Sequence, residues 1–384
     1  MRETNSRIRH FMSSLGRLTR HAEARLERLR AAGQHRVLRP THRATDARAS
    51  RAGRDLISFC DNDYLSLSCD PRLIHAACEA ARHYGVGAGA SRLITGDCPL
   101  NSVLEQRLAA MKGMEACLVF GSGYLANIGT IPALVGRNDT ILLDEFSHSC
   151  MHAGARLSGA EIRVFRHNDV SHAAELMQEA TGQILLLTET VFSMDGDLAP
   201  LEELAALCER HDAWLMSDDA HGLGIMEKPN PALIQMGTLS KAAGAYGGYV
   251  CAPAPVIDML VSRARSLVYT TGLPAPILAA AITALDIMHA EPQRAAQAKA
   301  NAALFCQLLD LPPPDSVIVP VIVGEEARAM TISAALEAEG YLVTAIRPPT
   351  VPEGTSRLRV TFASGHSEED VRRLSKALSA VMAA

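Results

Sequence analysis

Short apolar runs that end in polar, chemically reactive residues recur through the middle of the chain, and this pattern restricts its fold more than any other feature. Helical patterns separate the runs. Between residues 184 and 217, Pro200 stands where a first-turn proline belongs, and Leu201, Leu204 and Leu207 share one helical face. The alternation predicts an α/β fold around a mostly parallel sheet. The predicted strands lie at residues 117–120, 140–143, 184–188, 213–217 and 234–239.

The reactive side chains directly follow these strands. They are Gly121-Ser122-Gly123-Tyr124, His148, Ser193, the run Asp218-Asp219-Ala220-His221, and Lys241. In open α/β sheets, ligands bind outside the carboxyl ends of the strands. We therefore expect these residues to meet at one edge of the sheet and to form an active site.

The chain divides by composition into three parts. Residues 1–54 hold fourteen Arg, no Lys and four acidic residues, which is typical of a solvated N-terminal arm with helices; an Arg-rich transit peptide is the alternative. Residues 55–285 form the predicted large α/β domain. Three prolines from Pro312 break the pattern within residues 286–384, which predict a smaller α+β domain. Its expected elements are strands at 317–323, 341–346 and 358–362, and helices at 327–340 and from 367 onward.

Composition excludes several classes of protein. The formal net charge is −5 and the isoelectric point is near 6.3, which argues against a basic nucleic-acid binder. No apolar run reaches the roughly 18 residues that span a bilayer, and the first residues lack a secretory apolar segment. Nine cysteines without a C-x-x-C pair predict reduced thiols and a cytoplasmic protein.

Lys241 is one of only five lysines, and it lies among small residues where a predicted strand ends. A lysine in an apolar, glycine-rich stretch can lose its hydration, which lowers its pKa and makes the amine nucleophilic. The local sequence predicts either a Schiff-base lysine or an ordinary surface lysine of a loop.

Asp218 and His221 favour the first interpretation. Asp218 ends a strand with a buried pattern, so its carboxylate needs a cationic partner. A protonated pyridine nitrogen is such a partner in pyridoxal phosphate sites, and His221 could bond the phenolate oxygen of that cofactor. A metal site that includes Asp219 is the alternative, but no third ligand group has a recognisable spacing, so we expect no metal.

Two glycine-rich segments and two further residues complete the candidates. The turn at 121–124 precedes a helix expected to begin near Leu125, whose free amides could hold a phosphate. Residues 85–89 follow a helix rather than a strand, which disfavours a dinucleotide site. His148 could stack on a flat ring, and Arg347 suits a carboxylate clamp; a structural histidine and a surface ion pair are the alternatives.

Together these residues resemble the α-oxoamine synthases, which are fold-type I enzymes that use pyridoxal 5'-phosphate. The resemblance covers residues 55–365. It implies a large, mostly parallel α/β domain with a smaller α+β C-terminal domain, and a homodimer whose sites are built across the interface. The matching motifs are Asn62-Asp63-Tyr64-Leu65, Thr95-Gly96, Gly121-Ser122-Gly123-Tyr124, His167-Asn168-Asp169, residues 191–197, residues 218–222, and Thr238 with Lys241.

The resemblance also implies residue roles. Lys241 would carry the cofactor, Asp218 would hold its pyridine nitrogen protonated, and His148 would stack on its ring. His221 and Ser193 would bond the phenolate oxygen. The cofactor and its phosphate would also contact Gly123, Tyr124, Thr238 and, from the neighbouring subunit, Thr270 and Thr271. Asn62 and Arg347 would clamp the amino-acid carboxylate, Arg36 would contact the acyl substrate, and His148 and Thr350 would also contact substrate. The catalytic residues would be Lys241, His148, Asp218 and His221.

Residues 191–201 and 345–359 look most like the members that condense L-alanine with a pimeloyl thioester in biotin synthesis, releasing CO2 and the thiol. The acyl carrier would be coenzyme A or a carrier protein. The rivals are a synthase that uses glycine or serine with another acyl-CoA, an aminotransferase of the same fold, and a cofactor-free scaffold or nucleotide-binding module. Two segments depart from the family: Ala90-Ser91-Arg92-Leu93 replaces a Gly-Ser-Gly-His, and residues 226–231 are shorter than a Gly-rich loop of many members.

Overall fold

The computed structural model describes residues 2–31 and 33–383, and the contacts divide the chain into two compact units. One unit comprises residues 1–42 and 51–53, and the other comprises residues 43–50 and 54–384. The first contains the long helix α1 (Arg2–Ala31), on which Leu15, Leu18, Leu26 and Leu29 are exposed. The second contains every predicted site residue except Arg36.

Helices and strands alternate through the second unit, as the sequence predicts. Its helices are α2 (Pro71–Tyr84), the π-helix η1 (Arg92–Gly96), α3 (Pro99–Lys112), α4 (Gly123–Leu134), α5 (Ser149–Ser158), α6 (Val170–Gln178), α7 (Leu201–Arg210), α8 (Ala254–Arg263), α9 (Arg265–Val268), α10 (Ala275–Ala290), α11 (Gln293–Leu308), α12 (Glu326–Ala338) and α13 (Glu368–Ala383). The strands are β1 (His42–Arg43), β2 (Arg48–Arg51), β3 (Arg54–Ser58), β4 (Ala116–Phe120), β5 (Thr140–Asp144), β6 (Glu161–Phe165), β7 (Ile184–Glu189), β8 (Trp214–Asp218), β9 (Ile234–Thr238), β10 (Gly248–Ala252), β11 (Ile318–Gly324), β12 (Tyr341–Leu342), β13 (Thr344–Ile346) and β14 (Ser356–Thr361).

The central sheet has seven strands in the order β4-β10-β9-β8-β7-β5-β6. Strands β5 to β9 pair in parallel, whereas β10 runs antiparallel to both β9 and β4. The carboxyl ends of the five predicted strands therefore share one edge of the sheet. The predicted β-α-β unit is present, and Pro200 caps the start of its helix, α7.

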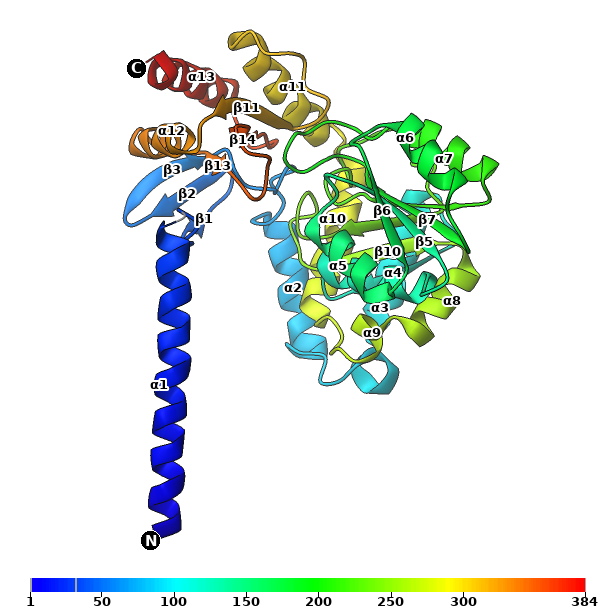
Figure 1. Ribbon diagram of the computed structural model, residues 1–384. Helices are drawn as coiled ribbons and strands as arrows, with labels where there is room; N and C mark the ends of the chain where they lie inside the picture. The colour runs from blue at the N-terminus through cyan, green and yellow to red at the C-terminus, as the bar shows by residue number, and fades with distance from the viewer. Residues whose placement is uncertain (1, 32, 384) are drawn as a thin grey trace. The chain divides into compact units, whose positions relative to one another are not determined.

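Helices cover both faces of this sheet, so its strands are buried on both sides. Helices α4, α5 and α8 cover one face, called here the front face, where Leu187, Met216 and Met236 point. The back face is covered by α2, α3 and α10, and α2 and α10 lie side by side (Figure 1). Because side chains alternate along a strand, Asp218 and the next residue, Asp219, leave the end of β8 towards opposite faces.

Two smaller sheets have the strand orders β1-β2-β3-β12 and β11-β14-β13. The first combines three strands from residues 42–58 with β12, and the second is formed by C-terminal strands alone. One predicted element is wrong: residues 341–346 form two strands rather than one. Strand β12 pairs in parallel with β3, and β13 pairs antiparallel with β14. The chain changes sheets at Val343, and periodicity alone carries no signal for such a change because both strands are apolar.

Candidate active site

Lys241, His221 and Tyr64 form a continuous chain of contacts beyond the carboxyl ends of β8 and β9. Lys241 Nζ lies 2.6 Å from His221 Nε2, and His221 Nδ1 lies 2.6 Å from the Tyr64 hydroxyl. That hydroxyl also donates to Asn62 Oδ1 at 3.1 Å. The predicted amine is therefore held in place by a buried histidine and a buried tyrosine.

Burial controls the protonation of this chain. It lowers the pKa of the Lys241 ammonium to about 8, although the charges of Asp218 and Glu189 act in the opposite direction. Burial and the Lys241 charge hold the pKa of His221 well below its usual range, and burial raises the pKa of Tyr64 to about 12. A neutral His221 accepts from Lys241 at Nε2 and donates to Tyr64 from Nδ1. Lys241 can thus supply a free amine near neutral pH.

Asp218 presents a buried carboxylate on the front face of the sheet. Its Oδ2 accepts a hydrogen bond from Asn127 Nδ2 at 2.9 Å, and its Oδ1 accepts from the Ala220 amide at 2.9 Å. Burial raises the pKa of Asp218, and the Lys241 charge opposes this. Among the described residues no basic side chain forms an ion pair with Asp218, so the carboxylate is suited to accept a cationic ring nitrogen.

The charge of Asp218 acts on both His148 and Glu189. His148 caps helix α5, its Nδ1 accepting from the Cys150 amide at 3.2 Å. Burial lowers the pKa of His148, and the charges of Asp218 and Lys241 also act on it. Glu189 ends β7 in register with Asp218, and burial together with the Asp218 charge raises its pKa well above the usual range. We interpret Glu189 as a neutral carboxylic acid.

Helix α4 begins beside the end of β9. The Ser122 hydroxyl caps the helix by accepting from the Leu125 amide at 3.2 Å. The amides of Gly123 and Tyr124 donate to no group among the described residues. A Cβ on Gly123 would lie 3.4 Å from the Cβ of Thr238, so the helix start and the strand end are in close contact. Free amides at a helix start bind phosphate well, and the Thr238 hydroxyl lies at the same place.

Arg359 reaches this site from β14 of the smaller sheet. It is only 7% exposed, and its Nε donates to the Ser193 carbonyl. Its terminal nitrogens donate to Asn62 Oδ1 at 3.2 Å, and one lies 3.4 Å from the Tyr64 hydroxyl. No carboxylate pairs with Arg359 in the part of the chain that the structure describes. A buried guanidinium without an anion is costly, which marks a place for an anionic ligand group.

Thr270, Thr271 and Arg36 are the predicted residues whose contacts involve a second subunit or the acyl substrate. Thr270 and Thr271 follow α9 and line a crevice with Gly121. Their predicted contact with the neighbouring subunit's cofactor stays a prediction. Arg36 is exposed in the unit formed by residues 1–42 and 51–53, and its substrate contact also stays a prediction.

Arg347 and Thr350 share a loop between β13 and β14. Arg347 Nη1 donates to Glu326 Oε1 at 2.5 Å, and the Thr350 amide donates to the Arg347 carbonyl at 3.1 Å. The guanidinium of Arg347 therefore already has an anionic partner, unlike that of Arg359. The substrate contacts of Arg347 and Thr350 stay predictions.

No site role was predicted from the sequence for four residues of the cluster: Asn127, Glu189, Arg359 and Tyr64, which was named only as part of a family motif. Glu189 carried the signal used for Asp218, an acidic residue at the end of an apolar strand. Asn127 is one of two buried polar residues, with Thr130, in a mostly apolar helix. Arg359 lies on a strand whose residues are all buried, and nothing local distinguishes it from the neighbouring Arg357.

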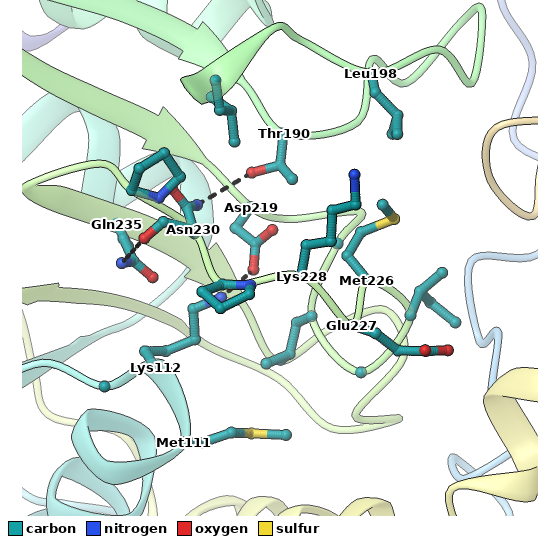
Figure 2. A pocket seen from close by; sticks show the side chains of 18 of the residues that line it. Met111, Lys112, Thr190, Leu198, Asp219, Met226, Glu227, Lys228, Asn230 and Gln235 are labelled. Atoms are coloured by element: carbon teal, nitrogen blue, oxygen red, sulfur yellow. Dashed lines mark hydrogen bonds and ion pairs between the residues drawn. The ribbon is translucent and has the colours of Figure 1, made fainter. Parts of the chain in front are cut away.

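A cavity of about 670 Å³ lies on the back face of the sheet, and Lys241 is not among its lining residues. Figure 2 shows the side chains that line this cavity. Lys112 and Asp219 form an ion pair at 2.6 Å in its wall, and Asn230, Gln235 and Met226 also line it. Among the described residues no group of three or more His, Cys, Asp or Glu could hold a metal ion. No described helix is long and apolar enough to cross a membrane.

Comparison with known proteins places this geometry in a family. The family model for class I and II aminotransferases matches residues 54–378. The 8-amino-7-oxononanoate synthase of Methylobacterium radiotolerans is 55% identical over 363 residues, covering 94% of this chain and 97% of the relative. That of Methylorubrum extorquens is 56% identical over 360 residues, covering 93% and 94%. A solved serine palmitoyltransferase variant from S. paucimobilis with a bound PLP–myriocin aldimine has a TM-score of 0.88 at 26% identity, covering 94% and 96%.

The chain therefore belongs to the class I and II aminotransferase family of pyridoxal-phosphate enzymes. Within that family it belongs with the 8-amino-7-oxononanoate synthases, a group of acyltransferases, to which it is more than half identical over nearly its whole length. The predicted family resemblance, fold class and cofactor are confirmed.

The described residues fit this cofactor. Asp218 is a buried carboxylate with no basic partner, which suits a protonated pyridine nitrogen. The free amides of Gly123 and Tyr124 suit a phosphate. Lys241 offers an amine whose pKa is lowered to about 8, which leaves it free to react near neutral pH.

Proposed function

We propose that this protein condenses L-alanine with a pimeloyl thioester to give 8-amino-7-oxononanoate, CO2 and the free thiol, as a step of biotin synthesis. Near-full-length identity with relatives of that name supports the proposal. The observation that carries it within the molecule is Arg359, a buried guanidinium without an anion close to Lys241. An α-amino acid would bring a carboxylate to Arg359 and an amine to the neighbourhood of Lys241.

Pyridoxal phosphate, when bound, supplies a cationic aromatic ring that accepts negative charge from the amino-acid Cα. Asp218 would hold a proton at the ring nitrogen, and His148 would stack on the ring. His221 and Ser193 would bond its phenolate oxygen, and the Gly123 and Tyr124 amides with the Thr238 hydroxyl would hold the phosphate.

Lys241 serves as the base at the alanine Cα. Its lowered pKa, about 8, leaves a useful share of free amine near neutral pH. We assign the alanine carboxylate to Asn62 and Arg359 instead of to Asn62 and Arg347, because Glu326 already pairs with Arg347. Arg347 and Thr350 contact the acyl substrate. A bond then forms between the alanine Cα and the thioester carbonyl carbon as the C–S bond breaks. The carboxylate subsequently leaves as CO2, and a proton returns to the same carbon.

The direct test incubates the purified holoenzyme with L-alanine and a pimeloyl thioester and measures product mass, CO2 and free thiol. Equal amounts of all three are expected. CO2 without the product mass, or an amino-group transfer without CO2, would contradict the proposal.

A synthase that uses glycine or serine with another acyl-CoA is the second candidate, because the serine palmitoyltransferase above shares the fold at a TM-score of 0.88. Assaying three amino acids against pimeloyl-CoA, pimeloyl-carrier protein and long-chain acyl-CoA separates the two. A preference for serine with a long chain would favour the second.

Several further features belong to the same proposal. We propose a homodimer in the cytoplasm, with Thr270 and Thr271 reaching the partner's cofactor phosphate and Arg36 contacting the acyl chain. A carrier protein is proposed as one source of the acyl group. We also propose that residues 55–285 act as the cofactor domain, residues 286–384 as the smaller domain and residues 1–54 as the arm.

A further inference from the structure

His167 is a partly buried histidine that lies between two carboxylates, outside the group of contacts around Lys241. Its Nδ1 lies 3.0 Å from Asp144 Oδ1 and its Nε2 lies 2.7 Å from Asp197 Oδ2. Both ring nitrogens must carry protons to donate to both carboxylates. Burial lowers the pKa of His167, but hydrogen bonds and charges of Asp144 and Asp197 outweigh burial and raise it to about 10.

The surroundings fix the position of this ring. Phe146 stacks on it with centroids 4.5 Å apart, and Phe192 meets it edge-on at 4.3 Å. The next residue, Asn168, donates to Asp197 Oδ2 at 3.0 Å and to the Leu198 carbonyl at 3.1 Å. Two side chains that follow β6, those of His167 and Asn168, thus converge on the Asp197 carboxylate.

Asp197 ends the loop of residues 193–197, which begins with the proposed cofactor contact Ser193. The loop is tight, since the Gly196 amide donates to the Phe192 carbonyl at 2.8 Å and the Phe192 amide donates to the Asp197 carbonyl at 3.0 Å. A shift at Asp197 therefore moves the whole turn, including Ser193.

The other side of this loop is held by the smaller sheet. Arg357 forms an ion pair with Asp195, and Arg359 donates to the Ser193 carbonyl. Ser316 Oγ donates to the Gly196 carbonyl at 2.7 Å. The loop thus joins the central sheet to the strand that carries Arg359, and His167 is its anchor on the central-sheet side.

We propose that His167, clamped between Asp144 and Asp197, is a positioning residue that sets Ser193 and Arg359 for the cofactor and the amino-acid carboxylate. This inference rests on the roles given to those two residues in the proposed function. His167 touches neither ligand, and it acts only through the loop.

The variants separate charge from packing. His167→Phe keeps an aromatic ring against Phe146 and Phe192 but removes both ion pairs. Asp197→Asn keeps the loop's shape and removes one of the two charges. Arg166→Gln is the matched control. Arg166 is the residue before His167, and this substitution breaks its ion pair with Asp169 but leaves the loop of residues 193–197 untouched.

The first measurement is hydrogen exchange in the holoenzyme. Exchange of the Phe192 and Gly196 amides is expected to rise at least about tenfold in His167→Phe and less in Asp197→Asn, while residues 184–189 of β7 keep their protection. The KM for alanine is expected to rise about 10- to 100-fold with a smaller change in kcat, because misplacement of a carboxylate clamp costs this much. The control should match wild type in both.

The second measurement is a double-mutant cycle on the affinity for pyridoxal phosphate. If His167 acts through Ser193, then His167→Phe and Ser193→Ala together should weaken binding less than the product of their separate effects. Two results would overturn the proposal. One is that the two substitutions weaken cofactor binding by the full product of their separate effects. The other is that His167→Phe loses stability while its Phe192 and Gly196 amides exchange as slowly as in wild type. If His167→Phe fails to fold, Asp197→Asn decides by the same criteria. Loop exchange and cofactor affinity do not depend on the acyl substrate, so failure of the alanine condensation alone would count against the proposed function only.

Discussion

Two lysine–aspartate sets share the end of β8 but lie on opposite faces of the central sheet. On the back face, Lys112 Nζ meets Asp219 Oδ2 at 2.6 Å, and the two charges neutralise each other (Figure 2). On the front face, Lys241 contacts a neutral histidine, and Asp218 contacts an amide and a backbone N–H. The back-face charges are satisfied within the protein, whereas the front-face charges are available to a ligand.

The comparison shows that unmatched charge locates chemistry better than cavity volume does. The cavity of about 670 Å³ includes Lys112 and Asp219 and excludes Lys241. The front-face cluster instead combines an amine with a lowered pKa, a carboxylate with a raised pKa and a guanidinium without an anion. Shifted pKa values of this kind collect where a protein binds and transforms ligands.

The largest expected difference is between the two lysines. Lys241→Ala should lower turnover by about 1000-fold or more, because it removes both the cofactor's anchor and the base at Cα. Borohydride should fix the cofactor mass to the peptide that contains Lys241 in wild type and to no peptide in the variant. Lys112→Ala should still be labelled at Lys241. A reducible adduct in Lys241→Ala would remove that residue from its role.

Substitution of Asp218 should impair catalysis, whereas substitution of Asp219 should mainly reduce stability. Asp218→Ala should bind the cofactor yet exchange the alanine Cα proton with solvent at least about 100-fold more slowly, since the ring nitrogen loses its anionic partner. Asp219→Ala leaves the largely buried Lys112 without its anion and should cost about 3 kcal/mol of stability with Cα exchange nearly kept. Proton exchange by NMR and urea unfolding measure the two effects. Near-normal exchange in Asp218→Ala would contradict the comparison.

The two arginines test which residue receives the amino-acid carboxylate. Arg359→Lys should raise the KM for alanine by about 10- to 100-fold, because a point charge cannot replace a bidentate donor. Arg347→Lys should change it less, since Glu326 already pairs with Arg347. Steady-state kinetics with alanine as the varied substrate distinguish them, and a larger effect at Arg347 would reverse the assignment.

Local sequence predicted the parts of the site that strand ends provide. Ser193, Asp218, Lys241 and the turn at Gly123 follow apolar runs, and strands that alternate with helices bring such residues to one edge. Arg359 comes from a different sheet, and its buried position depends on packing between distant segments. No local pattern reports that packing, which is why a buried arginine looked like any other strand residue.

Local sequence likewise gave no signal for the charge of His167 or for the change of sheet between β12 and β13. His167 entered the sequence analysis only as part of a family motif, because its charge depends on Asp144 and Asp197, which lie far apart in the sequence. The change of sheet between β12 and β13 likewise depends on which distant strand each piece meets. Tertiary partners decide these features, whereas periodicity reports only which residues are buried.

The dependence of stability on pH extends the comparison to a charge that is paired inside the protein. His167 titrates near 10 in the folded protein and near 6.5 when unfolded, so between these values the folded state holds a proton that the unfolded state lacks. Its stabilising contribution is complete below pH 6.5 and is lost as the pH rises towards 10, by at most about 1.4 kcal/mol per pH unit. The contribution of Lys241 to stability has the opposite sign. Because its pKa is lowered from 10.5 to about 8 on folding, the folded state gains stability as the pH rises between these values. Unfolding the apoprotein with urea at several pH values should therefore show wild type losing stability relative to His167→Phe from pH 6.5 upward. With Lys241→Met as the background the absolute stability of the protein that keeps His167 should fall more steeply above pH 8, while its difference from the His167→Phe protein stays the same. Parallel curves for wild type and His167→Phe would show that the imidazole is not charged by its two carboxylates.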